Sequence, residues 1–160
     1  MTKPKIKVKV NDKEGMLQVE LKGKLDETGR DALDRLRQIE ASSYCVDLSE
    51  LSFISSAGIH QWVVFLKECD QKTIILENCP AVFINQANII MDMTRNCQIR
   101  SFQTDFYCEK CQAQSSEVFA SSLGIEAIMA KCQQAVCKKC DHHLLLEVPP
   151  EHYFRFLEGQ

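Results

Sequence analysis

Glycine, proline and long apolar runs are scarce in this 160-residue sequence, and these shortages exclude several classes of protein. The six glycines form no glycine-rich phosphate loop, so the chain is not expected to transfer a phosphoryl group. No stretch approaches the roughly 18 apolar residues that cross a bilayer, which argues against membrane insertion. The N-terminal segment MTKPKIKVKV has lysines but no apolar core, so we expect no secretory signal and a cytoplasmic location.

The sequence also lacks a surplus of positive charge. Its formal net charge is -3 and its pI is about 5.8, whereas nucleic-acid-binding proteins usually present a basic face. Nucleic acid is therefore not the expected partner of the chain as a whole. Hydrophobic residues make up 45% of the sequence and charged residues 26%, which is enough apolar material for a folded core.

Nine cysteines are scattered along the chain. A secreted disulfide framework normally has an even number of cysteines in a shorter chain. The count fits a reducing compartment better, with four cysteines on a metal ion and the others buried as small apolar side chains.

Hydrophobic periodicity divides the first two thirds of the chain into strands and helices. Alternating apolar residues predict a hairpin of two strands, after which single strands alternate with amphipathic helices. Asp26 is a suitable N-cap for the first of these helices. This order is typical of an α/β fold with a largely parallel or mixed sheet. The expected strands are 6–10, 16–22, 44–47, 73–76 and 99–106, and the expected helices follow Asp26, begin near residue 59 and begin at Pro80.

Two CxxC motifs lie in the last third of the chain: Cys108 and Cys111 form the first, and Cys137 and Cys140 form the second. Two residues between cysteines allow both thiolates of one turn to reach the same ion, and two such turns supply four tetrahedral ligands. We therefore expect one structural zinc ion (Zn2+) per chain in a small zinc-ribbon-like module, with no open coordination position for catalysis. A redox-active dithiol is the alternative.

Three further side chains bear on this assignment. Cys132 is able to replace one ligand, but it shares a helical face with apolar neighbours and is expected to be buried. His142 and His143 are also potential zinc ligands. Because four cysteines already fill a tetrahedral site, we expect both histidines to be exposed.

A change in composition near residue 106 suggests a domain boundary. We expect an α/β domain over residues 1–105, the cysteine module over 106–149 and an aromatic tail over 150–160. Residues 105–147 hold four lysines and six acidic residues, a balance of -2, which favours a protein-binding module over a nucleic-acid-binding one. The apolar tail is expected to pack onto its own module rather than remain exposed as a docking element.

A serine-containing loop joins a short apolar strand to the clearest amphipathic helix. Its sequence is VDLSELSFISSAGI at residues 46–59, so Ser55 and Ser56 lie where the helix begins. A serine hydroxyl in this place can accept a hydrogen bond from a free backbone amide as an N-cap. Gly58 lies just inside the helix, where glycine costs about 1 kcal/mol relative to alanine. Its presence suggests that another group approaches the backbone closely.

This loop resembles the STAS family, the domain of anti-sigma factor antagonists, as do LKGKLD at residues 21–26 and Ala32 and Leu33 in the first helix. The resemblance covers roughly residues 5–106 and excludes the cysteine module. It implies a mixed β-sheet with helices packed on one side. It also implies a non-enzymatic regulatory protein that binds an anti-sigma factor-like serine kinase or another regulatory protein, and it is compatible with a homo-oligomer.

Members of the family are typically phosphorylated on a serine or threonine at the start of the second helix, a position that Ser56 occupies. The resemblance therefore implies partner switching, in which phosphorylation of Ser56 controls binding. Ser55 stands where the family often has aspartate, and Ala57 where it often has serine or threonine, so Ser55 is the alternative acceptor. The implied partner-binding residues are Ser55, Ser56, Ala57, Gly58 and Ile59.

Three functions stay open at this point. The first is the partner-switching regulator, and the second is a constitutive scaffold that binds through the zinc module and uses Ser56 only as a helix cap. The third is a zinc-ribbon nucleic-acid binder. Ser56 and His60 are one helical turn apart, as a nucleophile and its base could be. Catalysis is nevertheless not expected, because no third residue is placed to orient the imidazole of His60.

Overall fold

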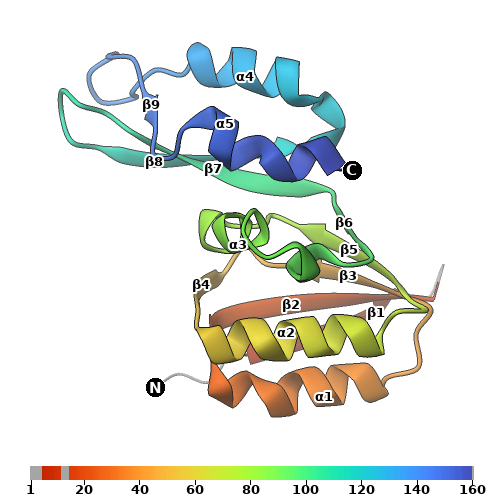
Figure 1. The fold of residues 1–160 in the computed structure, drawn as a ribbon. Coiled ribbons are helices and arrows are strands. Elements are labelled where there is room, and N and C mark those ends of the chain that lie inside the picture. The colour runs from red at the N-terminus through yellow and green to blue at the C-terminus, as the bar shows by residue number, and fades with distance from the viewer. Residues whose placement is uncertain (1–4, 12–14, 160) are drawn as a thin grey trace.

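Two β-sheets organise the protein, and the chain passes from one to the other at Arg100 (Figure 1). The structure is a computed structural model that describes residues 5–11 and 15–159. The first sheet contains β1 (Lys5–Asn11), β2 (Met16–Leu25), β3 (Ser43–Asp47), β4 (Leu51–Ile54), β5 (Thr73–Glu77) and β6 (Cys97–Ile99). The second contains β7 (Ser101–Tyr107), β8 (Gln114–Ala120) and β9 (Leu145–Leu146).

The first sheet is mixed, which is one of the two arrangements expected from the order of the elements. Its strand order is β1-β2-β3-β5-β6, and β4 pairs with the end of β2. β1 and β2 are antiparallel, with Ile6 opposite Leu21, and the other pairs are parallel. The predicted hairpin is thus confirmed, and residues 12–14, between its two strands, lie outside the described residues.

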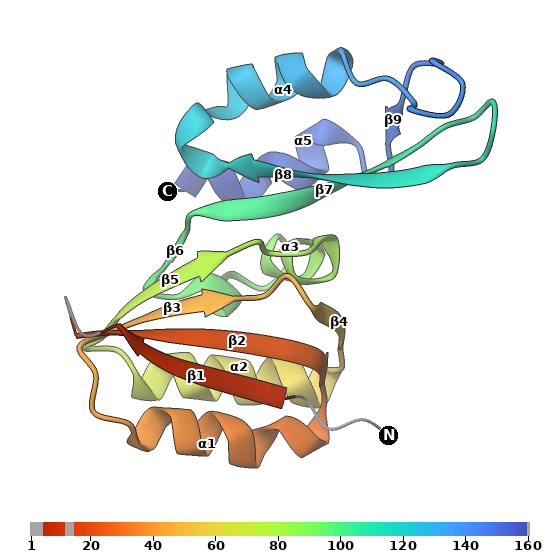
Figure 2. The ribbon, with the colours of Figure 1, turned by 180° about the vertical axis from the view of Figure 1, so that it is seen from behind.

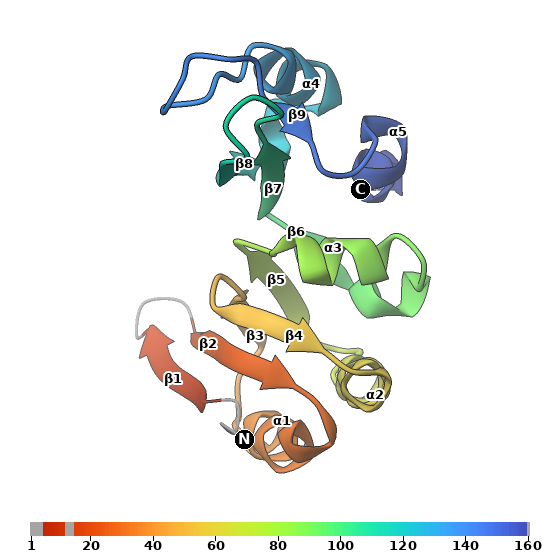
Figure 3. The same cartoon turned by 90° about the vertical axis from the view of Figure 1, so that its left-hand side faces the viewer.

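Three helices cover one side of this sheet (Figure 3). They are α1 (Arg30–Gln38), α2 (Ser56–Glu68) and α3 (Ala81–Ala87), with single 3-10 turns at η1 (Glu27–Gly29) and η2 (Met91–Thr94). Asp26 caps η1 rather than α1 itself, because its carboxylate accepts the Thr28 amide at 2.9 Å. Pro80 is the N-cap of α3, as expected from the preference of proline for helix starts.

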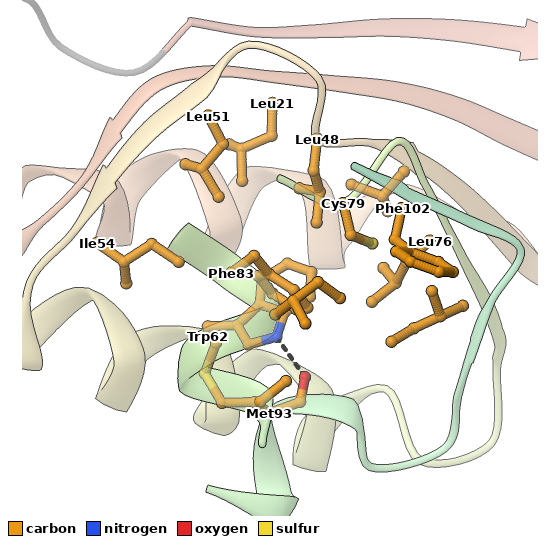
Figure 4. Close-up of a cluster of buried hydrophobic side chains, with 14 of the residues drawn as sticks. Leu21, Leu48, Leu51, Ile54, Trp62, Leu76, Cys79, Phe83, Met93 and Phe102 are labelled. Atoms are coloured by element: carbon orange, nitrogen blue, oxygen red, sulfur yellow. Dashed lines mark hydrogen bonds between the residues drawn. The ribbon is translucent and has the colours of Figure 1, made fainter. Parts of the chain in front are cut away.

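The core lies between the helices and the sheet. Leu17, Val19 and Leu21 of β2 are buried, while the residues between them are only partly buried, which is the alternation expected for a half-covered sheet. Trp62 of α2 lies at the centre, and its indole N–H donates to the Met93 carbonyl at 2.8 Å (Figure 4). This bond satisfies the one polar atom of the largest buried side chain in the described residues.

Two strand assignments differ from those expected. The segment LSELSFISS is predicted as a loop, but its middle forms β4, where Leu51 and Ile54 are buried and the two residues between them are exposed. That burial pattern does not alternate, so periodicity cannot reveal the strand. The single strand expected at 99–106 is divided at Arg100, and its two parts join different sheets.

The second sheet is antiparallel, with strand order β8-β7-β9. The helix α4 (Ile125–Gln133) lies on the side away from the first sheet (Figures 1 and 2). The chain ends in the short helix α5 (Pro150–Tyr153) and the 3-10 helix η4 (Phe154–Gly159). In the described part of the chain, no helix is both long and apolar enough to span a bilayer.

The aromatic tail fills the junction between the two sheets. Tyr153 and Phe154 are 3% and 1% exposed, and both rings lie against Phe102 of β7. The Asn88 side-chain amide, next to α3, donates to the Tyr153 carbonyl at 2.8 Å, and the Tyr153 hydroxyl donates to the Gln103 carbonyl. The tail is buried rather than left exposed, as expected, but these partners, Asn88, Phe102 and Gln103, precede the cysteine module onto which it was expected to pack.

The division expected between residues 105 and 106 falls inside β7. The start of β7 is hydrogen-bonded to the segment that follows β5 of the first sheet, since the Gln103 amide donates to the Cys79 carbonyl at 2.8 Å. Phe102 belongs to the same buried cluster as Trp62 and Leu76 (Figure 4). One continuous core therefore runs through both sheets.

Replacement of Phe154 by alanine is expected to destabilise the protein by about 3–5 kcal/mol, because it empties a fully buried ring site at the junction. The matched control is Phe53→Ala. Phe53 is 47% exposed, so its loss should cost about 1 kcal/mol or less. Urea unfolding followed by tryptophan fluorescence measures both values, and equal costs would contradict the junction role of Phe154.

Candidate metal centre and serine loop

The two CxxC motifs meet at one point. The Sγ atoms of Cys108, Cys111, Cys137 and Cys140 all lie within 4.8 Å of one another. The Sγ distances from Cys108 to Cys140 and from Cys111 to Cys137 are both 3.5 Å. A tetrahedral site with metal–sulfur bonds of about 2.3 Å separates its sulfurs by about 3.8 Å. The four cysteines are therefore arranged to hold a metal ion.

The two turns that carry these cysteines have the same backbone hydrogen bonds. In the first turn the Gln112 amide donates to the Cys108 carbonyl at 2.9 Å, and in the second the Asp141 amide donates to the Cys137 carbonyl at 2.8 Å. Gln112 and Asp141 both adopt positive φ, 58° and 55°. Each turn thus folds back immediately after its second cysteine, which directs both thiols of the turn to the same side.

Different elements deliver the two turns. Cys108 follows β7 directly, and its amide donates to the Ala113 carbonyl at 2.9 Å, which closes the hairpin to β8. Cys137 follows the end of α4, and its amide donates to the His142 carbonyl at 2.8 Å. The site therefore forms only when α4 folds back across the hairpin.

Backbone amides favour the ionised form of two thiols. The Cys111 amide lowers the pKa of the Cys108 thiol below its ordinary value. The Lys139 amide donates to Sγ of Cys137 at 3.4 Å and lowers the pKa of that thiol to about 7. Since metals bind thiolates, these amides prepare the site for a cation.

Cys140 retains its proton more strongly. The His142 amide lowers its pKa, but burial and the neighbouring thiols outweigh that amide and raise the pKa to about 12. A metal ion must displace this proton, so binding releases protons and the affinity falls as the pH falls.

The other potential ligands lie outside the cluster. Cys132 is 5% exposed in α4, and burial raises the pKa of its thiol to about 11, as expected of a packed apolar side chain. His142 and His143 are exposed. Their predicted exposure and the predicted burial of Cys132 are confirmed.

The serine loop shows a division of roles that the sequence leaves open. Ser55 is the N-cap of α2, and its hydroxyl accepts the Gly58 amide at 3.1 Å. Ser56 is the first residue of the helix and is exposed. The hypothesis that Ser56 is the helix cap is therefore wrong. The reason is that the Ser55 backbone is extended, with φ -88° and ψ 168°, and such a residue directs its side chain at the helix amides.

Gly58 is explained by the neighbouring strand. A Cβ atom on Gly58 would lie 2.0 Å from the Leu25 carbonyl oxygen, so α2 packs directly on the end of β2. The Ser55 amide donates to the same carbonyl at 3.0 Å. The close approach expected from the sequence is thus made by the protein's own backbone. It also brings the segments 21–26 and 46–59 into direct contact.

The five expected partner-binding residues differ in exposure. Ser56 and Ala57 are exposed, Ser55 and Ile59 are partly buried, and Gly58 is buried. Only the first two present a large part of their surface to a partner.

Sequence reasoning missed two features beside this loop. Phe53 of β4 is exposed, with the Lys24 ammonium 5.9 Å from its ring centroid. A groove of about 350 Å³ lies between α1 and α2, and Ala57 and His60 are among its lining residues. Its cations are paired, as in the 2.8 Å contact of Arg37 with Glu68. The sequence offers one signal for the exposed Phe53, which is an aromatic residue within a serine-rich loop. It offers none for the groove.

No protein-family model matches the chain, and no curated protein matches it.

The reduced protein is expected to carry about one metal ion per chain, and Cys111→Ser should lose most of it, because three thiolates bind far more weakly than four. Cys132→Ser is the matched control and should keep the metal, since Cys132 lies outside the cluster. Elemental analysis of the purified wild type and variants measures the number of metal ions per chain. Metal-free reduced wild type, or loss of metal in Cys132→Ser alone, would contradict this site.

Gly58→Ala is expected to destabilise the protein by more than about 2 kcal/mol, because a methyl group cannot fit 2.0 Å from the Leu25 oxygen. An alanine in an ordinary helix position would instead add about 1 kcal/mol of stability. The sign of the change in thermal unfolding separates the two cases.

Proposed function

We propose that this protein is a regulatory protein-binding module of the anti-sigma factor antagonist type, in which phosphorylation of Ser56 controls a partner. Residues 1–105 form the STAS-like module of this proposal, and residues 106–149 a zinc-ribbon-like attachment. Supporting the proposal, the two segments that carry the resemblance contact each other at the Leu25 carbonyl. The partner is an anti-sigma factor-like serine kinase or another regulatory protein, and the protein itself is not an enzyme.

The single observation that carries the proposal is the placement of Ser56. Its hydroxyl is exposed at the first position of α2, and the helix is already capped by Ser55. A kinase therefore has access to Ser56 without removing the cap. Modification of Ser55 would break that cap, which makes Ser56 the better acceptor.

A phosphate on Ser56 is compatible with the fold. It adds a charge of about -1.5 to -2 near neutral pH. The N-terminus of a helix carries a partial positive charge and free amides, which stabilise an anion. A partner packed over Ser56 and Ala57 has no such compensation, and burial of an unpaired dianion there costs several kcal/mol. A loss of about 2.8 kcal/mol is already a hundredfold in affinity.

We further propose that the metal is a structural zinc ion, one per chain. Four thiolates in a closed tetrahedral set are the usual ligands of structural zinc. When bound, zinc supplies a cross-link between the two turns and no catalytic function, since the four cysteines would fill its coordination shell.

The function is tested with Ser56→Asp and Ser56→Ala in affinity capture from the native cell extract. We expect Ser56→Ala to capture the same partner as the wild type. Ser56→Asp should bind that partner with an affinity about a hundredfold lower. The far-UV spectrum and most of the thermal stability should be unchanged in both. Mass spectrometry should map phosphate to Ser56.

Ser55→Ala is the matched control. It removes the cap and should cost about 1 kcal/mol of stability without abolishing partner binding. If the two Ser56 variants bind the same partner alike, the protein is a constitutive scaffold. Phosphate on Ser55, or elsewhere, would contradict the role of Ser56.

A further inference from the structure

The strand β8 forms a free edge of the second sheet. It pairs with β7 over seven residue pairs, and in the described part of the chain no strand pairs with its other side (Figure 3). Residues 114–118 are all exposed, and Val118 is 51% exposed. The opposite edge strand β9 has only two residues, so β8 is the long edge of this sheet.

This edge has few of the features by which proteins prevent strand pairing. Exposed edges usually carry lysine, proline or a bulge. The sequence of β8, QSSEVFA, contains no lysine or proline, and its register with β7 is continuous. Its one charged residue is Glu117. An extended strand can therefore add to β8 without a steric or a large electrostatic penalty.

The register with β7 determines which backbone groups are free. The Gln103 amide donates to the Cys79 carbonyl, away from β8, so the pair of Gln103 with Val118 is a non-hydrogen-bonded pair. The backbone groups of Val118 therefore point to the free edge, and so do those of every second residue. Gln114, Ser116 and Val118 present their N–H and C=O groups outward.

We propose that β8 pairs antiparallel with β8 of a second copy of this chain, on a two-fold axis at Ser116. This register uses the whole exposed stretch and joins the outward groups of residues 114, 116 and 118 in about six backbone hydrogen bonds. Ser116 lies opposite Ser116 of the second copy, and Val118 lies opposite Gln114. The two three-stranded sheets become one six-stranded sheet.

Charge selects this register. A two-fold axis at Glu117 would place two carboxylates opposite each other, which is destabilising. With the axis at Ser116, Glu117 lies opposite Ser115, whose hydroxyl can donate a hydrogen bond to a carboxylate. The edge is thus self-complementary, as an isologous interface requires, and this favours a second copy over an unrelated strand.

The test is sedimentation equilibrium of the full-length, metal-loaded protein over about a hundredfold range of concentration. The range must be wide because an interface made by one pair of short edge strands is small and associates weakly. A monomer–dimer equilibrium is expected. Amide hydrogen exchange should show concentration-dependent protection of Ser116 and Val118, whereas Glu117, bonded to β7, should be protected throughout. A monomer at every concentration overturns the proposal, and so does equal exchange of Ser116 at both extremes.

Ser116→Pro should weaken dimerisation by about tenfold or more, because it removes an outward N–H and no bond to β7. Ser116→Ala is its control: both variants lose the hydroxyl bond to Asp105, but Ser116→Ala keeps the amide and should remain dimeric.

The register is tested at Ser115. Ser115→Lys should tighten the dimer several-fold, because the lysine would face Glu117 of the second copy, and Ser115→Glu should weaken the dimer. If neither Ser115 variant changes the association, the register is wrong. None of these outcomes depends on phosphorylation of Ser56.

Discussion

The burial of Phe102 between the two sheets is the packing interaction on which the arrangement of this protein depends. The ring lies at the start of β7, next to the backbone bridge to Cys79, and rings from the C-terminal tail surround it. A unit of about 60 residues, the size of the part that holds the second sheet, is only marginally stable by itself. By sharing Phe102 and the tail with the larger core, the second sheet gains a fixed position. The hairpin that carries Cys108 is fixed with it.

The start of α2 depends on a second close contact. The helix lies so near β2 that only glycine fits at position 58, and the Ser55 amide and hydroxyl both make hydrogen bonds there. The backbone at the helix start is therefore immobilised from both sides. Ser56, the next residue, is left as an exposed side chain on a rigid support. A modification at this point changes the surface charge without requiring a change of fold.

The sequence predicted the features that depend on local pattern. The N-terminal hairpin, the three helices and the convergence of the four cysteines followed from apolar spacing and from the CxxC repeats. The roles of Ser55 and Ser56 could not be separated, because both serines are acceptable caps and the choice is made by the backbone angles of Ser55. The reason for Gly58 was equally hidden, since the Leu25 carbonyl is 33 residues away in the chain. The strand β4 and the division at Arg100 depend on tertiary pairing, which periodicity does not encode.

The separation of the two cysteine turns along the chain has a thermodynamic consequence. The segment between Cys111 and Cys137 contains all of β8 and α4, so a metal ion that joins the turns closes a loop of 25 intervening residues. A cross-link of that length removes about 3.5 kcal/mol of chain entropy from the unfolded ensemble, as a disulfide would. Unlike a disulfide, this link is reversible and depends on the free metal concentration. A metal ion held there would also be tied directly to the common core, because Cys108 and Cys137 belong to the same buried cluster as Phe102.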